Sequence, residues 1–525
     1  MSYRKLNCID RLVSSLRTTA AAAAIAVAAS SSAFAEGTLR YAMTDEPPHL
    51  DVHVTTAGLT SIIAMQIFET LYTFNANLEP VPLLVASEET SEDGLTVKMT
   101  LRDNVPFHNG NTMDAGDAVA SLKRWGEHGG RGKILFDKIE SVEATGSHEV
   151  TIKFKEAFGP WKNLVAFMNG GPAIMPAEVL AEATGEPLAN EQMIGTGPFK
   201  FKEWRPNRHI EVVRFDDYAQ PAGKPDGFAG SKEVNLDAVR FVPVPDVGTR
   251  VSGVQAGDYD MAERIPGDLF EELDADDSVV VQLDGIPDLP LIFFNSAGGI
   301  MKDNYKLRQA IMASLKHDDA LRIAVGPEDL WDDHGAIYRD GQFWYTDAGT
   351  ENYPSGDVDK AKALAAEAGY NGETITFMIS SSYPLHHDTG QVFAQQMKDA
   401  GFNIDLQVYD WPTLVERRAQ AELWDMFETT HGAMPDPVLY TFMNDNYPGW
   451  WVSPEKEALE AEFTSTTDPA ARKAIWDQLQ ALIYDQVPVV KPGDVFLYNI
   501  ASPKVQGIPE VDRMFWPTFW NVSVN

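Results

Sequence analysis

Residues 357–431 alternate between helix-like and strand-like hydrophobic periodicity, which limits the possible folds more than any other feature of the chain. We expect helices over 358–368, 391–400 and 413–419, and strands over 375–379, 404–409 and 425–430. Helices and strands that follow one another in this way form a parallel or mixed sheet, because each helix carries the chain back across it. This stretch is therefore predicted to be an α/β lobe.

A second stretch, Leu101–Trp125, has the pattern of a strand end, a tight turn and a capped amphipathic helix. Hydrophobic residues alternate up to Leu101, Asn109-Gly110 marks the turn, and Asp114 is the expected N-cap. Hydrophobic residues then recur on one helical face, and the helix is predicted to end at Gly126.

The residues of this stretch also resemble the signature of family 5 solute-binding proteins, the extracytoplasmic receptors of dipeptide, oligopeptide and nickel ABC importers. Asn109 and Gly116 stand where the family pattern more often has Asp and Glu. Similar blocks follow in order from about Thr38 to the C-terminus. The residues that fit are Phe107, His108, Gly110, Ala115, Asp117, Ala118, Ser121 and Arg124.

The resemblance implies an α/β protein with a two-lobed type II periplasmic-binding-protein fold, the Venus-flytrap fold, and a small extra subdomain in the first lobe. It implies no cofactor. The predicted parts are residues 1–35 as a signal peptide, 36–78 and 191–287 as the first lobe, 79–190 as its subdomain, 288–489 as the second lobe and 490–525 as the return to the first. The chain should cross between the lobes near Gly285–Pro290 and Val487–Pro492.

The N-terminus reads as an export signal. Basic residues precede a short apolar run, Ala20–Ala29, and Ala33-Phe34-Ala35 has the small-x-small form of a cleavage site. We expect cleavage after Ala35 and a free protein in the periplasm. Cleavage also removes Cys8, the only cysteine, so disulfides and cysteine chemistry are excluded from the mature chain.

The formal net charge of −35 makes binding to nucleic acid or to anionic lipid unfavourable. The simplest interpretation is a solvated acidic surface that keeps the protein in solution. A preference for cationic ligands is the alternative.

Sequence motifs for catalysis are absent. The chain has no nucleophile elbow, no His-Glu-x-x-His zinc motif and no phosphate-binding loop, the nearest being Gly132-Lys133-Ile134. The pair His386-His387 is predicted to lie on a solvated loop, and no spacing of residues indicates a metal site.

Aromatic residues are concentrated in the loops that follow the predicted strands of the second lobe, where α/β folds bind ligands. Trp424 should belong to the core, whereas Trp411, directly after a strand, is expected to contact the solute. The candidate ligand-binding residues are Trp411, Tyr383, Asp436, His431, Trp451, Asn295, Ser381 and Ala433.

In the dipeptide-binding branch, the family resemblance implies a charged clamp at each end of the ligand. An Arg two residues before a Tyr holds the carboxylate, and an Asp three residues before an Asp-Pro pair holds the ammonium. Here Ser381 precedes Tyr383 and Ala433 precedes Asp436-Pro437. Both clamps are missing, so we expect a glycoside, an amine or a modified amino acid rather than a simple dipeptide, with an oligopeptide as the alternative.

The favoured function is a receptor that captures a small solute between two lobes and delivers it to an ABC permease and its ATPase. We expect a monomer that does not bind nucleic acid. A periplasmic hydrolase using paired carboxylates is the rival from another class, and a chaperone-like protein is a third.

Overall fold

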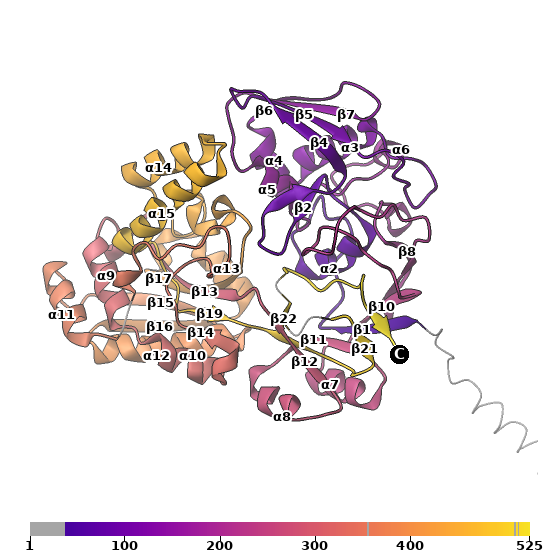
Figure 1. The fold of residues 1–525 in the computed structure, drawn as a ribbon. Coiled ribbons are helices and arrows are strands. Elements are labelled where there is room, and N and C mark those ends of the chain that lie inside the picture. Colours follow the sequence, from indigo (N-terminus) through magenta and orange to yellow (C-terminus); the bar gives the residue numbers. More distant parts are fainter. Residues whose placement is uncertain (1–36, 354–355, 509–510, 513) are drawn as a thin grey trace, which may run out of the picture.

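The computed structural model describes residues 37–353, 356–508, 511–512 and 514–525. The predicted signal peptide and its cleavage site lie outside these residues. The described chain forms two lobes side by side, with a smaller sheet on the first lobe (Figure 1).

The first lobe is built on an eight-stranded mixed sheet. Strand β1 lies between β10 and β11 and runs parallel to both, so the segment from β10 to β11 forms a βαβ unit around helix α7. In spatial order the strands are β22 (Val511–Asp512), β12 (Val280–Asp284), β20 (Tyr498–Ala501), β11 (Met261–Ile265), β1 (Thr38–Met43), β10 (Ala238–Pro243), β9 (His209–Arg214) and β8 (Phe199–Arg205). The helices of this lobe are α2 (Gly58–Ile67), α7 (Val247–Ala256) and α8 (Phe270–Asp274).

The subdomain carries its own antiparallel sheet of four strands, in the order β4-β5-β7-β6. Its strands are β4 (Val85–Thr90), β5 (Thr96–Leu101), β6 (Ile139–Ala144) and β7 (Glu149–Phe154), beside the ribbon β2 (Tyr72–Phe74) and β3 (Pro80–Pro82). Its helices are α3 (Ala115–His128), α4 (Gly130–Phe136), α5 (Trp161–Ala166) and α6 (Ala177–Leu180).

Helix α3 begins as predicted but ends later. The Asp114 side chain accepts hydrogen bonds from the backbone N–H groups of Gly116 and Asp117, which confirms the cap. The predicted end at Gly126 is wrong, because the helix continues to His128. A Cβ at Gly126 would lie 2.4 Å from the Phe136 ring, so this glycine allows α4 to pack closely against α3.

The second lobe has a mixed sheet whose two faces are covered by different helices. In spatial order its strands are β14 (Trp331–Asp332), β19 (Asp494–Val495), β13 (Asp288–Phe294), β17 (Met426–Gly432), β15 (Thr374–Ser380) and β16 (Asn403–Tyr409), and β18 (Val489–Val490) also pairs with β13. The helices are α9 (Tyr305–Ser314), α10 (His317–Ala324), α11 (Val358–Glu367), α12 (Pro384–Asp399), α13 (Trp411–Arg418), α14 (Pro454–Ser465) and α15 (Pro469–Gln486). Hydrophobic clusters fill both faces of this sheet.

The chain crosses between the lobes twice. The first crossing, 285–287, joins β12 to β13 and lies within the predicted segment. The second differs from the prediction, because β18 and β19 still pair with β13 in the second lobe. The return to the first lobe therefore occurs at 496–497, between β19 and β20, rather than at residue 490.

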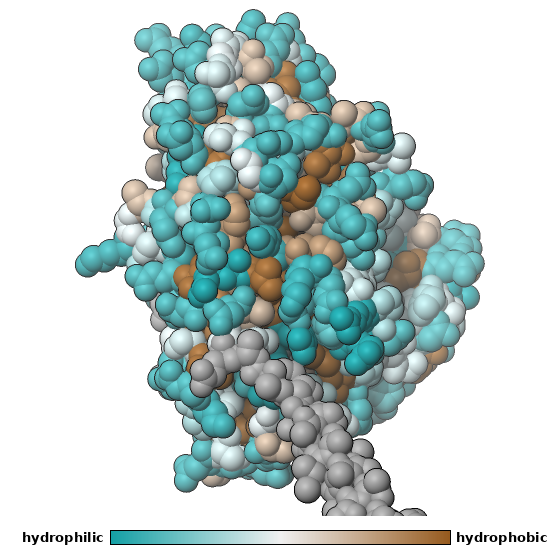
Figure 2. Space-filling model, turned by 90° about the vertical axis from the view of Figure 1, so that its right-hand side faces the viewer, coloured by the Kyte–Doolittle hydropathy of each residue, from teal (hydrophilic) through white to brown (hydrophobic). Residues whose placement is uncertain are grey.

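The surface seen from the side of the first lobe is mostly hydrophilic, with hydrophobic side chains visible between the polar ones (Figure 2). This agrees with an acidic, solvated surface. Among the described residues, we find no helix that is both long and apolar enough to span a membrane.

Candidate functional site

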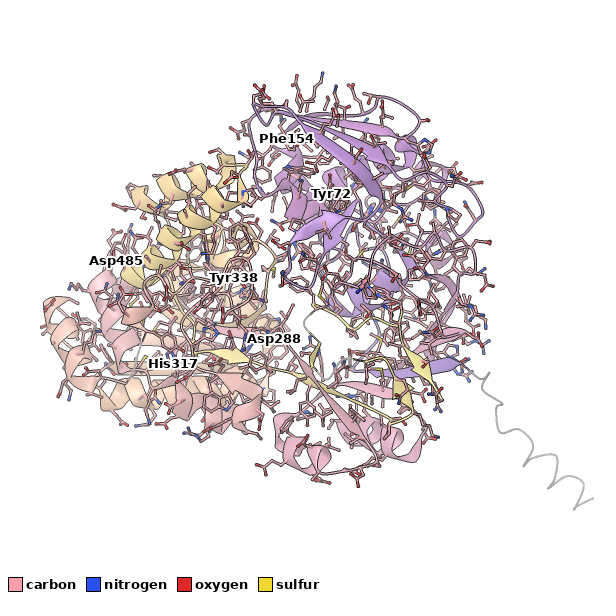
Figure 3. The ribbon with its side chains drawn as sticks, in the orientation of Figure 1. Tyr72, Phe154, Asp288, His317, Tyr338 and Asp485 are labelled. Carbon is pink, nitrogen blue, oxygen red and sulfur yellow. The ribbon has the colours of Figure 1, made fainter. Side chains whose placement is uncertain are left out.

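The strand ends of the second lobe face the first lobe, and the sheet register shows why. Strand β13 enters from the first lobe at Asp288, which pairs with Gly432 at the end of β17. Strands β15, β16 and β17 run parallel to one another, so their C-terminal ends share this edge. Asp288 accordingly lies at the junction of the lobes (Figure 3). Residues that follow these strands are placed where a solute can touch both lobes.

Aromatic rings gather at this edge. The loop after β15 is fixed to the end of β16, because Ser382 Oγ accepts a hydrogen bond from the Trp411 N–H at 2.9 Å. The Tyr383 and Trp411 rings meet edge to face, with centroids 5.3 Å apart, and the His386 ring lies 5.8 Å from that of Trp411. Tyr383 is 45% exposed, so this group of rings is open to solvent.

A guanidinium completes the group. Arg418 Cζ lies 5.2 Å from the ring centroid of Trp411 and 5.2 Å from that of Tyr447. His431 Nε2 is 2.8 Å from Thr441 Oγ1, and burial together with the nearby Arg418 charge lowers the pKa of His431 to about 4. His431 is therefore neutral at pH 7. We call Tyr383, His386, Trp411, Arg418, His431 and Tyr447 the strand-end cluster.

The first lobe presents a second guanidinium to the same region. Arg131, on α4, donates from Nη1 to the Asn169 side-chain oxygen at 2.6 Å, and its Nη2 lies 4.0 Å from Met434 Sδ in the second lobe. Its Cζ lies 4.8 Å above the Phe167 ring, which stacks on Trp516 at 5.4 Å. Burial lowers the pKa of Arg131 to about 10, so it remains charged at neutral pH.

Asp436 connects the lobes from a buried position. Both carboxylate oxygens accept hydrogen bonds from Arg472 Nη2, at 2.9 and 3.1 Å, and Asn163 Nδ2 of the subdomain donates to Oδ2 at 2.8 Å. The Asp436 side chain has no exposed surface. The expected ligand contact by Asp436 would therefore need this contact between the lobes to open.

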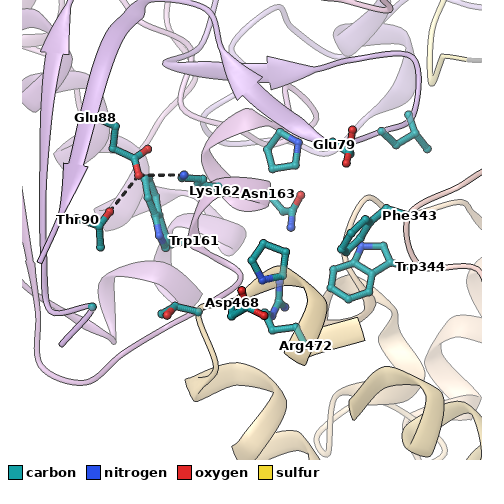
Figure 4. A pocket seen from close by; sticks show the side chains of 16 residues that line it. Glu79, Glu88, Thr90, Trp161, Lys162, Asn163, Phe343, Trp344, Asp468 and Arg472 are labelled. Atoms are coloured by element: carbon teal, nitrogen blue, oxygen red, sulfur yellow. Dashed lines mark hydrogen bonds and ion pairs between the residues drawn. The ribbon is translucent and has the colours of Figure 1, made fainter. Parts of the chain in front are cut away.

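A cavity of about 550 Å³ lies beside this contact, between the subdomain and the second lobe (Figure 4). Its size is typical of small-molecule sites. The charged groups in its wall already have partners, since Lys162 pairs with Glu88 at 2.9 Å and Arg472 with Asp436. The residues that line it include Glu88, Trp161, Lys162, Asn163, Phe343, Trp344, Asp468 and Arg472.

The other predicted residues divide between the edge and the interior. Ser381 is exposed at the strand ends and its hydroxyl donates to the Tyr409 carbonyl, whereas Ala433 is buried beside Met434. Trp451 and Asn295 are in the interior of the second lobe. The Trp451 indole donates to Gln486 at 2.7 Å, and the Asn295 amide donates to two backbone carbonyls.

The predicted loop around His386 is wrong. Helix α12 starts at Pro384, so His386 lies on its first turn, buried, with Nε2 2.6 Å from Thr430 Oγ1. Trp411 is likewise the first residue of α13 rather than part of a loop. In both helices a proline occupies the first or second position, where its missing N–H is tolerated.

Sequence reasoning missed Arg131 and Arg418. Arg131 directly precedes Gly132-Lys133-Ile134, a segment whose motif resemblance points only to a phosphate-binding loop. Arg418 follows Trp411 by seven residues, which is about two turns of a helix. This spacing indicates that both side chains lie on one face of the predicted helix.

One group among the described residues has the geometry of a metal site, namely Glu203, His209 and Glu211. Glu211 is already paired with Lys202 and Arg240 across the sheet. A metal ion would have to displace both cations, so these residues fit a salt-bridge network better.

Three comparisons relate the chain to known proteins. Residues 79–452 match the model of the bacterial extracellular solute-binding proteins, family 5. The chain is 30% identical over 520 residues to a probable peptide ABC transporter periplasmic-binding protein, y4tO, from Sinorhizobium fredii, covering 93% of this chain and 94% of that protein.

It is 24% identical to the oligopeptide-binding protein AppA of Bacillus subtilis, over 77% of this chain and 76% of that one. Among solved structures it resembles the periplasmic binding protein AgaA in complex with agropinic acid, with a TM-score of 0.75 and 24% identity over 93% of this chain and 99% of that chain.

Proposed function

Because the chain belongs to family 5 of the bacterial extracellular solute-binding proteins, we propose that it captures a small solute between its two lobes and delivers it to a membrane permease. The family and the two-lobed α/β fold predicted from the sequence are confirmed. Proteins of this family serve ABC importers and work with a permease and its ATPase. The protein is proposed to act as a monomer in the periplasm.

The observation that carries this proposal is the strand-end cluster at the edge facing the first lobe. Open aromatic rings on one lobe, and Arg131 and Trp516 packed on Phe167 on the other, provide two surfaces that one solute can touch together. A solute that contacts both lobes stabilises the closed arrangement over the open one, and the permease can then distinguish loaded from empty protein.

The solute is proposed not to be a simple dipeptide. Ser381 and Ala433, which stand at the two clamp positions, carry no charge, and the Ser381 hydroxyl already donates to the Tyr409 carbonyl. The nearby Asp436 is paired with Arg472. A glycoside, an amine or a modified amino acid fits better, and an oligopeptide held by its backbone is the second candidate.

Adding the correct solute is expected to reduce the radius of gyration. The two crossings, 285–287 and 496–497, are short and lie side by side between the sheets, as a hinge requires. Small-angle X-ray scattering with and without solute measures the change. An unchanged radius at a solute concentration that saturates a calorimetric titration would contradict closure.

Replacing Trp411 by alanine is expected to weaken solute binding by about 5- to 30-fold, since a stacked ring contributes about 1–2 kcal/mol. Isothermal titration calorimetry measures this change. Trp331→Ala is the matched control, because Trp331 lies in β14 at the opposite edge of the same sheet. Equal affinities of the wild type and Trp411→Ala would place the solute elsewhere.

The rival hydrolase is distinguished by its product. A receptor raises its melting temperature with solute and returns that solute unchanged, whereas a hydrolase converts it. Mass spectrometry of the solute after incubation with the protein decides between them.

A further inference from the structure

The guanidinium of Arg418 has no hydrogen-bond acceptor among the described residues. Helical side chains lean toward the N-terminus of their helix, and Arg418 accordingly extends back over α13 toward Trp411. Three rings surround its guanidinium, those of Trp411, Tyr447 and Phe427, the last at 5.5 Å. In the part of the chain that the structure describes, Arg418 has neither a hydrogen bond nor an ion pair through its side chain, and its buried Nη1 has no acceptor.

On the opposite lobe, the guanidinium of Arg131 has hydrogen-bond acceptors but no anionic partner among the described residues. Its Nη1 donates to Asn169, but its Nη2 meets only the Met434 thioether, a weak acceptor. Within the described ranges no carboxylate pairs with it. The Arg418 charge lowers the pKa of His431, and Arg131 contacts Met434. His431 and Met434 are three positions apart, so their Cα atoms are separated by at most about 10 Å.

Arg131 and Arg418 are both only partly exposed. Their lack of an anionic partner is informative because removing a cation from water is costly unless an anion and hydrogen bonds compensate it. This chain has 77 acidic residues against 42 Lys and Arg, so carboxylates are plentiful. Arg472, which also lies at the contact between the lobes, is paired with Asp436. The charges of these two guanidiniums, one on each lobe, can therefore be neutralised by an anion that does not belong to the chain.

We propose that the transported solute carries a carboxylate or a similar oxyanion, bound by Arg418 and Arg131 from opposite lobes, with its remaining part against Trp411 and Tyr383. This inference rests on the proposed receptor function. It favours the modified amino acid among the expected classes, because a simple glycoside or amine has no oxyanion. Guanidinium N–H groups match the two oxygens of a carboxylate, and the ring faces around Arg418 restrict other approaches.

The test uses acids and their neutral analogues on the full protein. N-acetylated amino acids and the corresponding amides differ only at the carboxyl group, and phenyl phosphate tests whether a phosphate can replace it. Thermal shift selects hits, and calorimetry measures affinity in the wild type, Arg418→Met, Arg131→Met and the surface control Arg322→Met. Arg322 belongs to the same lobe and is half exposed, at 49%.

We expect one or more acids to raise the melting temperature while their amides do not. Affinity should fall about ten- to hundredfold in Arg418→Met and Arg131→Met, because each loses charged hydrogen bonds, and should be unchanged in Arg322→Met. Without solute, Arg418→Met should melt at the same temperature as the wild type or higher, since it removes an uncompensated cation.

Three results would overturn the inference: no acid or phosphate stabilises the protein, amides or sugars stabilise it as well as acids, or the arginine variants bind the acid as tightly as the wild type. A clear loss of melting temperature in solute-free Arg418→Met would also overturn it, by giving Arg418 a structural role. A neutral solute that closes the lobes contradicts only the anionic class. Absence of closure with every solute contradicts the receptor function itself.

Discussion

Replacing Asp436 by alanine is expected to destabilise the second lobe by about 3–5 kcal/mol, the usual cost of removing one partner from a buried ion pair. Asp436 has no exposed surface and Arg472 is 4% exposed, so neither charge can be solvated by water. The alanine leaves the Arg472 guanidinium without its carboxylate. It also removes the acceptor of Asn163, so the contact between the lobes is weakened.

Denaturant unfolding, or thermal unfolding monitored by calorimetry, measures the loss in free energy of unfolding. Asp477→Ala is the matched control, because it breaks a partly exposed pair with Lys473 on α15 and should cost less than about 1 kcal/mol. In the double variant Asp436→Leu with Arg472→Met, neither charge remains, and much of the stability should return. Equal losses of unfolding free energy for Asp436→Ala and Asp477→Ala would show that the buried pair contributes no more to stability than the pair between Lys473 and Asp477.

The second large effect is a pH-dependent gain of stability on replacing Glu428 by glutamine. Glu428 lies in the middle of β17 with no exposure, and its Oε2 has no hydrogen-bond partner. Burial raises the pKa of this carboxyl from 4.5 to about 8, and a hydrogen bond from Thr389 offsets only part of the shift.

The direction in which stability changes with pH follows from how many protons the folded and the unfolded chain bind. Below about pH 4.5 both the folded and the unfolded chain hold the proton, so Glu428 does not affect the pH dependence there. Between pH 4.5 and 8 the unfolded chain releases it and the folded chain retains it, so the wild type loses stability as pH rises, by about 5 kcal/mol in total.

Glutamine keeps the shape of the side chain and has no proton to release. The variant should therefore differ little from the wild type near pH 5 and be more stable by about 4 kcal/mol near pH 8. Denaturant unfolding at several pH values measures the difference, with the exposed Glu416→Gln as the control. A difference between Glu428→Gln and wild type that does not change with pH would rule out a retained proton.

Much of the fold follows from the sequence because it depends on local patterns. Strands β15 and β16 lie within one residue of their predicted bounds, and the Asp114 cap is where the sequence indicates it. Alternation of helix and strand between 357 and 431 specifies an α/β lobe because each element must bury one apolar face. The family follows from residues near α3 such as Arg124, whose role is visible in its buried pair with Asp51 at 2.6 Å.

Other features depend on partners far along the chain, and these only the tertiary structure decides. Gly126 looks like a helix end, yet it is a contact point for Phe136. The second crossing falls at 496–497 because β18 and β19 pair with β13, about two hundred residues earlier.

In the candidate site, too, some features follow from local sequence patterns and others depend on contacts between distant segments. The sequence indicates that Trp411, Tyr383 and His431 lie near strand ends, because the bounds of a strand follow from local hydrophobic periodicity. It cannot indicate that Asp436 is neutralised by Arg472 or that, among the residues the structure describes, Arg131 and Arg418 lack such a partner. Whether a charge is available to a ligand depends on which side chains surround it in space, and folding alone brings those side chains together.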